Sequence, residues 1–357
     1  MQKKGKNLSK ESLLIYGHKN CILYGELFTT YKSIIKKIYS KTNSNGYSSQ
    51  LNSLLFPSSS TSKNDFFPCS SLNEKNVQIG MDINIFEIIE DNDSNFLSYM
   101  FSKFKHLKNL YRLTEGTTIN HLYQSDILKY KIVVPPSLPE QQKIAHFFSL
   151  LDKQIQLWER KLELYELIKV KIVNIVWKNE KINLCRILEP KTIFTNKKSN
   201  IKHFSLTNNF LGDKTERYNR DFLVKNENKK YKLIEMYDLI YNPSNLKFGS
   251  ISINFQGTGM VSPIYNIYEI KEMNFYYALH EIIKSKKFIE ISKMFQQGTV
   301  YERMQVIESD FLRLKVPKIF QNDEFKIKTI LDIINKSKKI LSNLKYKKKF
   351  YIKSLLL

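Results

Sequence analysis

The sequence is poor in the features that mark secreted, membrane-spanning and metal-binding proteins. Its three cysteines, Cys21, Cys69 and Cys185, lie far apart and form no Cys-x-x-Cys pair, which argues against a zinc ribbon and a disulfide framework. No run of about 18 uninterrupted apolar residues occurs, and residues 1–10 are polar with no apolar segment behind them. We therefore expect a protein of the reducing cytoplasm that neither is secreted nor spans a membrane.

The motifs of common DNA-modifying and nucleotide-hydrolysing enzymes are also missing. There is no Gly-x-x-x-x-Gly-Lys-Ser/Thr phosphate loop, and the six histidines show no metal-ligand spacing. An adenine methyltransferase needs Asn or Asp followed by Pro-Pro and an aromatic residue, which Asn242-Pro243-Ser244 does not supply. No Pro-Asp pair is followed by Glu-x-Lys, and we interpret Glu227-Asn228-Lys229 as a solvated loop. We expect no catalytic residue, no metal and no cofactor in this chain.

Positive charge is the strongest feature of the composition. The 57 Lys and Arg residues outnumber the 34 Asp and Glu residues, which leaves a net charge of +23. Such a balance favours a polyanionic partner, and nucleic acid and an anionic membrane surface both fit it. A lysine-rich chain can also reflect an AT-rich genome and solvated faces, so charge alone does not decide. The 42% of hydrophobic residues is enough for a real core.

The sequence contains an internal repeat. Ser125–Lys131 (SDILKYK) returns 184 residues later as Ser309–Lys315 (SDFLRLK). Two shorter pairs keep nearly the same spacing: Gly116-Thr117 with Gly298-Thr299, and Pro57-Ser58 with Pro243-Ser244. Each Ser-Asp segment is followed by a short strand-like run and then by a long helical pattern. The repeat predicts two similar domains, each followed by one long helix.

Each long helical pattern carries a heptad of apolar residues, which is typical of a coiled-coil seam. In the first, over 140–178, Lys169 is the only polar residue in the seam. The two apolar positions are occupied by Phe148, Ile155, Leu162 and Val176, and by Leu151, Trp158, Tyr165 and Ile172. The second pattern, over 324–357, has Ile327, Ile334 and Leu341 alternating with Ile330 and Leu344. We expect the two helices to form an antiparallel pair that acts as a rigid spacer.

The globular segments are predicted to mix short strands with helices, so the fold class is α+β with a small twisted sheet in each domain. Strands are expected at 21–24, 82–88, 236–241, 250–255 and 264–270, and helices at 96–110 and 275–295. The Ser/Asn-rich stretch 43–62 is expected to be a loop.

Several segments, in order along the chain, resemble the specificity subunits of Type I restriction-modification systems. The most specific is Val133–Ile144 (VVPPSLPEQQKI) followed by Leu151-Asp152, which is similar to the join between recognition domain and conserved helix in that family. Segments similar to the recognition domains themselves are Cys21–Leu27, Gly80–Asn84, Gly116–Thr118, Tyr241–Asn245, Gly249–Ile251 and Val261–Pro263.

The resemblance implies a subunit without a catalytic centre, which reads a bipartite site on double-stranded DNA and directs other subunits to it. It implies two target recognition domains, 1–134 and 181–319, a central spacer helix at 135–180 and a C-terminal one at 320–357. Two methyltransferase subunits would dock on the helices, and restriction subunits would then join. S-adenosylmethionine, ATP and Mg²⁺ would be bound by those partners.

Base contacts are expected from polar and basic side chains in loops that face the major groove. Taken singly, each candidate is more often an ordinary surface turn residue, and Asn242-Pro243 and Gly249 are readily explained by a turn. The candidates are Thr29, Thr30, Ser58 and Ser59 in the first domain, and Arg217, Asn219, Arg220, Ser244, Asn245 and Lys247 in the second.

The two halves also differ. Residues 182–188 have no counterpart before Ile22, so we expect the first recognition domain to lack its first strand, and the second helix has no Pro-Pro or Glu-Gln-Gln at its start. Two alternatives therefore stay open: a truncated or silent specificity cassette, and the recognition part of a fused restriction-methylation enzyme. A related gene with inverted flanking repeats would favour the first, and an upstream reading frame with a methyltransferase motif would favour the second.

Overall fold

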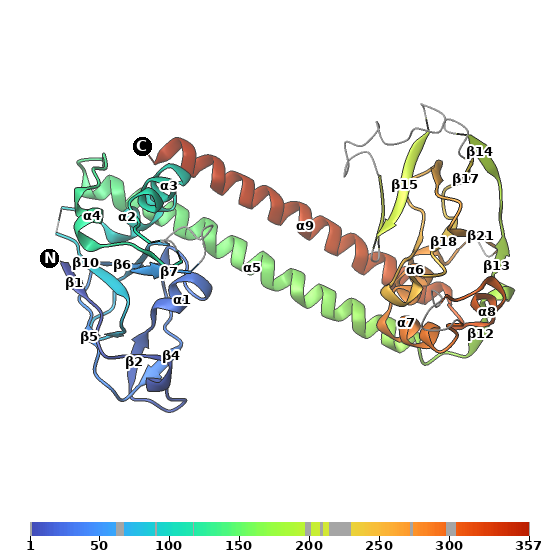
Figure 1. Ribbon diagram of the computed structural model, residues 1–357, viewed down its shortest axis with the longest axis horizontal. Coiled ribbons are helices and arrows are strands. Elements are labelled where there is room, and N and C mark those ends of the chain that lie inside the picture. Colours follow the sequence, from blue (N-terminus) through green and yellow to red (C-terminus); the bar gives the residue numbers. More distant parts are fainter. Residues whose placement is uncertain are drawn as a thin grey trace. The chain divides into compact units, whose positions relative to one another are not determined.

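The computed structural model describes residues 2–61, 68–89, 91–116, 118–196, 201–207, 210–213, 230–271, 274–297 and 305–356. The chain divides into two compact units, shown in Figure 1. The first consists of Met1–Arg160 together with Lys339–Leu357, and the second of Lys161–Lys338.

The first unit combines small sheets with short helices. A five-stranded sheet has the order β1-β10-β6-β8-β3, a four-stranded sheet has the order β4-β2-β9-β5, and β11 pairs with β7. The elements are β1 Gln2–Lys4, β2 Lys19–Ile22, α1 Tyr24–Thr29, β3 Ile34–Ile35, β4 Ser40–Thr42, β5 Tyr47–Ser48, β6 Ser53–Pro57, β7 Ser59–Ser60, β8 Ser70–Leu72, β9 Gln78–Ile79, β10 Ile83–Glu87, α2 Ser94–Phe101, α3 Phe104–Arg112, β11 Asn120–His121 and α4 Gln124–Lys129.

The second unit has the same kinds of element. Its sheets have the orders β13-β21-β18-β19 and β14-β17-β20-β15-β16, and β12 pairs with β22. The elements are β12 Lys181–Asn183, β13 Leu188–Pro190, β14 Phe194–Asn196, β15 Lys202–Thr207, β16 Phe210–Asp213, β17 Lys230–Ile234, β18 Leu239–Tyr241, β19 Ile251–Ile253, β20 Gly259–Val261, β21 Asn266–Ile270, α6 Tyr276–Ile283, α7 Lys286–Lys293, α8 Glu308–Arg313 and β22 Lys315–Pro317.

Strand pairing repeats from one unit to the other. In the first unit β1, β10, β6 and β8 form an antiparallel ladder in that order. In the second unit β13, β21, β18 and β19 form the equivalent ladder. The parallel pairing of β2 with β9 likewise returns as that of β15 with β20. The α+β fold class and the internal repeat are therefore confirmed.

Two long helices continue the repeat, α5 (Leu138–Val176) and α9 (Gln321–Leu355). In the first unit they run antiparallel, because Asp152 pairs with Lys348 and Glu159 with Lys345. Residues of the predicted apolar seam are buried in both units, among them Phe148 in the first unit and Val176, Ile327 and Ile334 in the second. Phe148, Val176 and Ile327 belong to the hydrophobic core of their own unit, so this part of the heptad pattern marks the face that each helix turns to that core.

Two predicted helices are each divided into two. The segment 96–110 forms α2 and α3, and the segment 275–295 forms α6 and α7. In the second case Ser285 has extended backbone angles and its hydroxyl accepts a hydrogen bond from the Phe288 amide. An N-cap of this kind starts a new helix and therefore interrupts the apolar periodicity that suggested one long helix.

The loop predicted for 43–62 is wrong, because this stretch contains β5, β6 and β7. Leu54, Leu55 and Phe56 form the buried centre of β6, which has β10 on one side and β8 on the other. The serine content concealed this strand, although the hydroxyl of Ser53 is satisfied by the Gln50 carbonyl. Strand β10 is buried on both faces from Ile83 to Phe86, and the Asn84 side-chain amide donates a hydrogen bond to the Leu122 carbonyl.

The start of each unit is built differently. Gln2–Lys4 (β1) pairs with β10 as Leu188–Pro190 (β13) pairs with β21. In the second unit β12 also pairs with β22, directly after the Ser-Asp helix α8. Residues 131–134, which follow α4 at the corresponding place, belong to no strand in the described part of the chain. That the first recognition domain lacks a strand stays a prediction.

Candidate nucleic-acid interface

The turn between β18 and β19 presents three of the predicted DNA-contacting residues, Ser244, Asn245 and Lys247. It is shaped by Asn242, whose side-chain oxygen accepts a hydrogen bond from the Ser244 amide at 3.1 Å. Gly249 closes it with a φ of 80°, a left-handed conformation that favours glycine. Asn245 is exposed, whereas Ser244 and Lys247 are half-buried. The turn therefore offers a mixed polar and basic edge to a ligand.

An aromatic ring that sequence reasoning missed lies in the same turn. Phe248 is 59% exposed, and the Lys247 ammonium lies 5.1 Å from its ring centroid. A flat exposed ring beside a cation is the combination that contacts both bases and phosphates. The adjacent Lys247 and Phe248 could have suggested this pair from the sequence, but the exposure of the ring is known only from the structure of the turn.

Ser58 and Ser59 occupy the corresponding place in the first unit. Ser58 is 8% exposed, and its backbone bonds to Asp82 and Leu122. Ser59 lies in β7 and pairs with His121. A similar backbone bond, from Val306 to the Pro243 carbonyl, holds the turn of the second unit. These positions anchor the chain segment that leads to α4 or α8, which favours a structural role for Ser58.

Thr29 and Thr30 lie exposed at the end of α1. The Thr29 hydroxyl donates to the Gly25 carbonyl at 3.0 Å, and the two threonine hydroxyls lie 3.3 Å apart. The next residue, Tyr31, accepts a hydrogen bond from the Tyr39 amide and so folds the following loop back. The end of α1 and that loop therefore form one exposed surface of the first unit.

Residues 37–39 add to that surface two side chains that were not predicted. Tyr39 is 62% exposed and stacks on Tyr31 with 6.4 Å between ring centroids, while the Lys37 ammonium lies 5.3 Å from the Tyr39 ring. Each unit thus combines predicted polar residues with an exposed aromatic ring and a lysine. Arg217, Asn219 and Arg220 lie outside the described residues.

The join between globular part and helix is held by a buried glutamine in the first unit. Gln141 is 1% exposed, and its amide oxygen accepts from the Asp93 amide, directly before α2. Its amide nitrogen donates to the Asn92 side chain and to the Pro135 carbonyl. The first glutamine of the Glu-Gln-Gln motif is therefore held by contacts within the first unit.

Glu324 takes the equivalent position in the second unit. Its carboxylate accepts from the Tyr277 and Ala278 amides in the first turn of α6, at 3.1 and 2.7 Å. Burial raises the pKa of Glu324, although these hydrogen bonds oppose the shift. The sequence shows no Glu-Gln-Gln motif here because in the second unit a glutamate, not a glutamine, accepts the hydrogen bonds from the start of the short helix.

Replacing Gln141 with alanine is expected to lower the free energy of unfolding by about 2 kcal/mol, because the partly buried Asp93 amide and the buried Pro135 carbonyl lose their partner. Urea unfolding measures this loss. Gln142, which is exposed in the same helical turn, provides the matched control. Gln142→Ala should change stability by less than about 0.5 kcal/mol, and equal effects of the two substitutions would contradict the assignment.

A partly buried polar cluster lies where α5 meets α6. The Lys169 ammonium contacts Glu166 at 3.0 Å and Glu281 at 3.2 Å. Burial acts to raise the pKa of Glu281, but the hydrogen bond with His280 and the charge of Lys169 outweigh it and lower this pKa to about 2. The one polar residue in the predicted seam thus forms an ion pair with the globular part of its own unit.

His280 in this cluster predicts a pH dependence of stability. Burial lowers the pKa of His280 below its ordinary value of 6.5, and its ring nitrogen lies 3.2 Å from the Ser252 hydroxyl. Below pH 6.5 the unfolded chain therefore binds a proton that the folded chain resists, so stability falls as the pH falls. Between pH 7.5 and 5.5 we expect a slope of at most about 1.4 kcal/mol per pH unit.

Chemical denaturation across this pH range checks the prediction. His280→Gln cannot titrate there, so its stability should change less with pH than that of the wild-type chain. An unchanged slope in this variant would assign the pH dependence to other groups.

Neither a metal centre nor a membrane span is found in the described part of the chain. Among those residues no three His, Cys, Asp or Glu side chains are grouped so that they could hold a metal ion. No helix there is both long and apolar enough to cross a membrane.

Comparison with known families matches residues 70–166 to the Type I restriction modification DNA specificity domain. The whole chain is similar in structure to the S subunit of a Type I restriction-modification system from M. genitalium, with 15% sequence identity and a TM-score of 0.63. That match covers 99% of this chain and 93% of the other. The chain has the fold of a Type I specificity subunit.

A second solved structure is similar over nearly the whole chain. It is a chain from a study of complex assembly and conformational transition of the type I R-M system, with 9% identity and a TM-score of 0.50. This match covers 99% of the present chain and 94% of the other. No curated protein matches the chain significantly in sequence.

The resemblance noted in the sequence is therefore confirmed. The matched residues 70–166 include the join Val133–Ile144 and Leu151-Asp152, which carried the most specific part of that resemblance. They also include Gln141, whose contacts hold α5 to its globular part. The family match thus includes the segment in which Gln141 holds α5 to its globular part.

Proposed function

We propose that this chain is the DNA-reading subunit of a Type I restriction-modification complex, and that each of its two units reads one half of a bipartite site. The observation that carries the proposal is the repeat of strand pairings, since the first unit also contains most of the matched DNA specificity domain. A chain that carries the same reader twice has the form that a two-part site requires.

Charge and surface chemistry support DNA as the ligand. The net charge of +23 provides phosphate affinity. Thr29, Thr30 and Asn245 supply exposed hydrogen-bonding groups that distinguish base edges in the major groove. Tyr39 and Phe248 add exposed rings beside lysines.

The partners belong to the same proposal. Two methyltransferase subunits dock on the long helices, and restriction subunits complete the complex. Exposed leucines recur every seven residues on α5, at Leu150 and Leu157 in the first unit and at Leu164 in the second, and each is about half exposed. Apolar stripes of this kind favour a protein partner.

Catalysis is assigned to those partners, which bind S-adenosylmethionine, ATP and Mg²⁺, so the chain itself has neither a catalytic centre nor a cofactor. The proposed compartment is the cytoplasm, where the DNA substrate is found.

The first test is co-expression with the neighbouring methyltransferase, followed by single-molecule sequencing of the host DNA. A methylated motif with two defined halves is the expected result. A soluble complex that methylates no motif would contradict the proposal and favour a truncated or silent cassette.

Variants in single units make the test sharper. Thr29→Ala with Thr30→Ala should relax base preference in one half of the motif, and Asn245→Ala with Lys247→Ala should relax it in the other. A lost base contact is worth about 1–3 kcal/mol of discrimination. Lys315→Ala, at an exposed position of β22, is the matched control and should leave both halves unchanged. Loss of preference in both halves with either variant would contradict the assignment of one half-site to each unit.

A further inference from the structure

A groove lies between the C-terminal part of α5 and α7, entirely within the second unit. It encloses about 960 Å³ and is lined by residues of α5, α6, α7 and their connections. Figure 1 shows α7 beside the C-terminal end of α5. Two helices that leave a groove between them offer a seat for a third helix, because side-chain ridges of one helix pack into the grooves of another.

The floor of the groove is apolar. Val173 is buried, while Val170 on the same helix is 51% exposed. Across the groove, Ile291 is half-buried and Met294, which follows α7, is 75% exposed. Apolar side chains that line a groove and remain exposed favour an apolar ligand surface, and the flexible methionine adapts to its shape.

Positive charge exceeds negative charge around this floor, because the groove is lined by four lysines and two glutamates. Lys284, Lys286 and Lys287 line the groove, and none has a carboxylate within ion-pair distance among the residues that the structure describes. The Lys287 ammonium instead lies 5.0 Å from the Trp177 ring. Burial lowers the pKa of Lys284, and the charge of Glu281 opposes this shift.

The two carboxylates that line the groove each already form an ion pair with a lysine. Glu281 forms an ion pair with Lys169 at 3.2 Å, and Glu290 forms one with Lys293 at 2.8 Å. Each carboxylate thus already has a lysine partner and only partly offsets the charge of Lys284, Lys286 and Lys287, so a ligand that brings further carboxylates would gain from the lysine charges.

We propose that this groove binds an acidic amphipathic helix of a protein partner. Its apolar face packs on Val170, Ile291 and Met294, and its carboxylates pair with Lys284, Lys286 and Lys287. The inference rests on the proposed function, because the helix would belong to another subunit of the same complex. It adds the site on this chain and the chemistry of the segment that the site accepts.

DNA fits the groove less well than such a helix. A phosphate backbone satisfies the lysines but has no apolar face to cover Val170 and Met294.

The proposal is tested with a synthetic peptide of about 18 residues, or five helical turns. Leucine stands at every third or fourth position and glutamate beside it. Fluorescence anisotropy of the labelled peptide is measured against the full chain. We expect saturable binding, at least about ten-fold weaker for a peptide of the same composition in scrambled order.

Substitutions locate the peptide on the chain. Val170→Asp and the pair Lys284→Gln with Lys286→Gln should each weaken binding about ten-fold, since one adds repulsion on the apolar face and the other removes two attractive charges. Lys315→Gln removes one exposed lysine of the same unit outside the groove and should leave binding unchanged. Circular dichroism checks that every variant keeps its fold.

Three outcomes would overturn the proposal. The first is equal binding of the scrambled peptide, which would mark an unspecific cationic surface. The second is full displacement by a DNA duplex of about 20 base pairs whose own binding also falls with Lys284→Gln and Lys286→Gln, which would mark a phosphate site. The third is a dimer of the free chain that Val170→Asp dissociates, which would make a second copy the occupant.

The test is independent of the sequencing experiment. Methylation of a bipartite motif without peptide binding would remove the groove proposal and leave the proposed function intact. Peptide binding in the groove without any methylated motif would leave the groove proposal intact and contradict the proposed function.

Discussion

Replacing Phe311 with alanine is expected to destabilise the second unit by about 4 kcal/mol, which is typical for the loss of a fully buried aromatic ring. Phe311 is 0% exposed and stacks on Tyr241 with 4.0 Å between ring centroids. Tyr268 lies on it at 5.4 Å, and the Tyr241 hydroxyl donates to the Val306 carbonyl. The substitution therefore removes the ring that joins α8 to the sheet of its unit.

Hydrogen exchange along the full chain measures the effect unit by unit. Amides of β18, β19 and β21 should lose protection, while those of β6, β8 and β10 keep theirs. Ile127 holds the corresponding place in the first repeat and is 7% exposed, so Ile127→Ala is the matched control with the opposite expectation. Uniform loss of protection across both units with either variant would show that the two units unfold as one.

The Ser-Asp repeat was visible in the sequence because it serves a packing purpose in both units. Ile127 and Phe311 follow the repeated Ser-Asp pairs, and both belong to the buried core of their unit. Periodic burial of this kind leaves a pattern that can be read without coordinates. The heptad residues Phe148, Ile155 and Ile327 were found for the same reason.

Other features could not be predicted because they depend on single polar contacts. The split between α6 and α7 is set by Ser285, which caps the start of α7. Nothing in the sequence distinguishes this serine from the many others in the chain. Glu324 holds in the second unit the position that Gln141 holds in the first, and both bind the start of a short helix. Because the two residue types differ, a motif search misses Glu324.

The candidate DNA interface was predicted only in part. Ser244, Asn245 and Lys247 do gather in one turn, since residues close in sequence share a turn. Tyr39 was missed because its place beside the end of α1 follows from the hydrogen bond with Tyr31. Ser58 was chosen for its polarity, but the bonds of its backbone place it inside the sheet.

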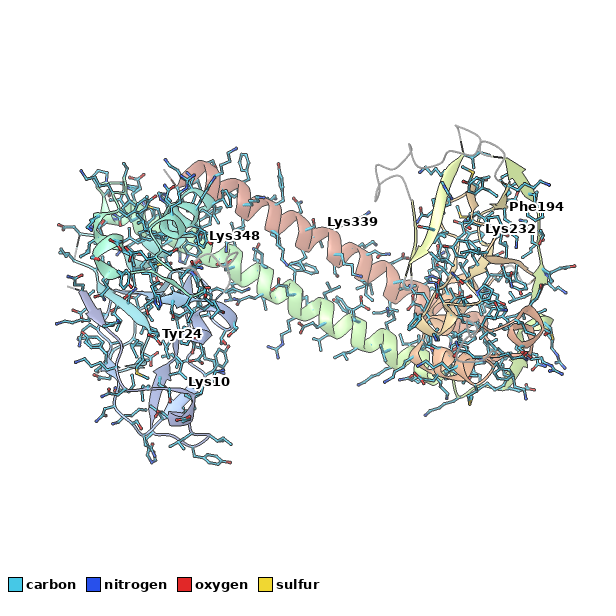
Figure 2. The ribbon with its side chains drawn as sticks, viewed as in Figure 1. Lys10, Tyr24, Phe194, Lys232, Lys339 and Lys348 are labelled. Atoms are coloured by element: carbon cyan, nitrogen blue, oxygen red, sulfur yellow. The ribbon has the colours of Figure 1, made fainter. Side chains whose placement is uncertain are left out.

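Removing the carboxylate of Asp152 should cost the first unit about 3 kcal/mol. Asp152 is 8% exposed and accepts from the Tyr99 hydroxyl at 2.9 Å and from the Lys348 ammonium at 2.6 Å. Lys348 comes from α9 and is labelled in Figure 2, and it also lies 5.5 Å from the Tyr99 ring. Asp152→Ala leaves a mostly buried ammonium and a buried hydroxyl without their acceptor, which is the costly way to break such a pair.

A double-mutant cycle separates this cost from the net value of the interaction. Lys348→Met removes the ammonium and keeps the length of the side chain, so Asp152→Ala with Lys348→Met should recover at least about 1 kcal/mol of the loss measured by urea unfolding. Additive losses would mean that the ion pair contributes nothing and that Asp152 acts through Tyr99 alone. Recovery would instead show that the Leu-Asp end of the family motif fixes α5 to α9 through charge, as Gln141 fixes α5 to α2 through neutral hydrogen bonds.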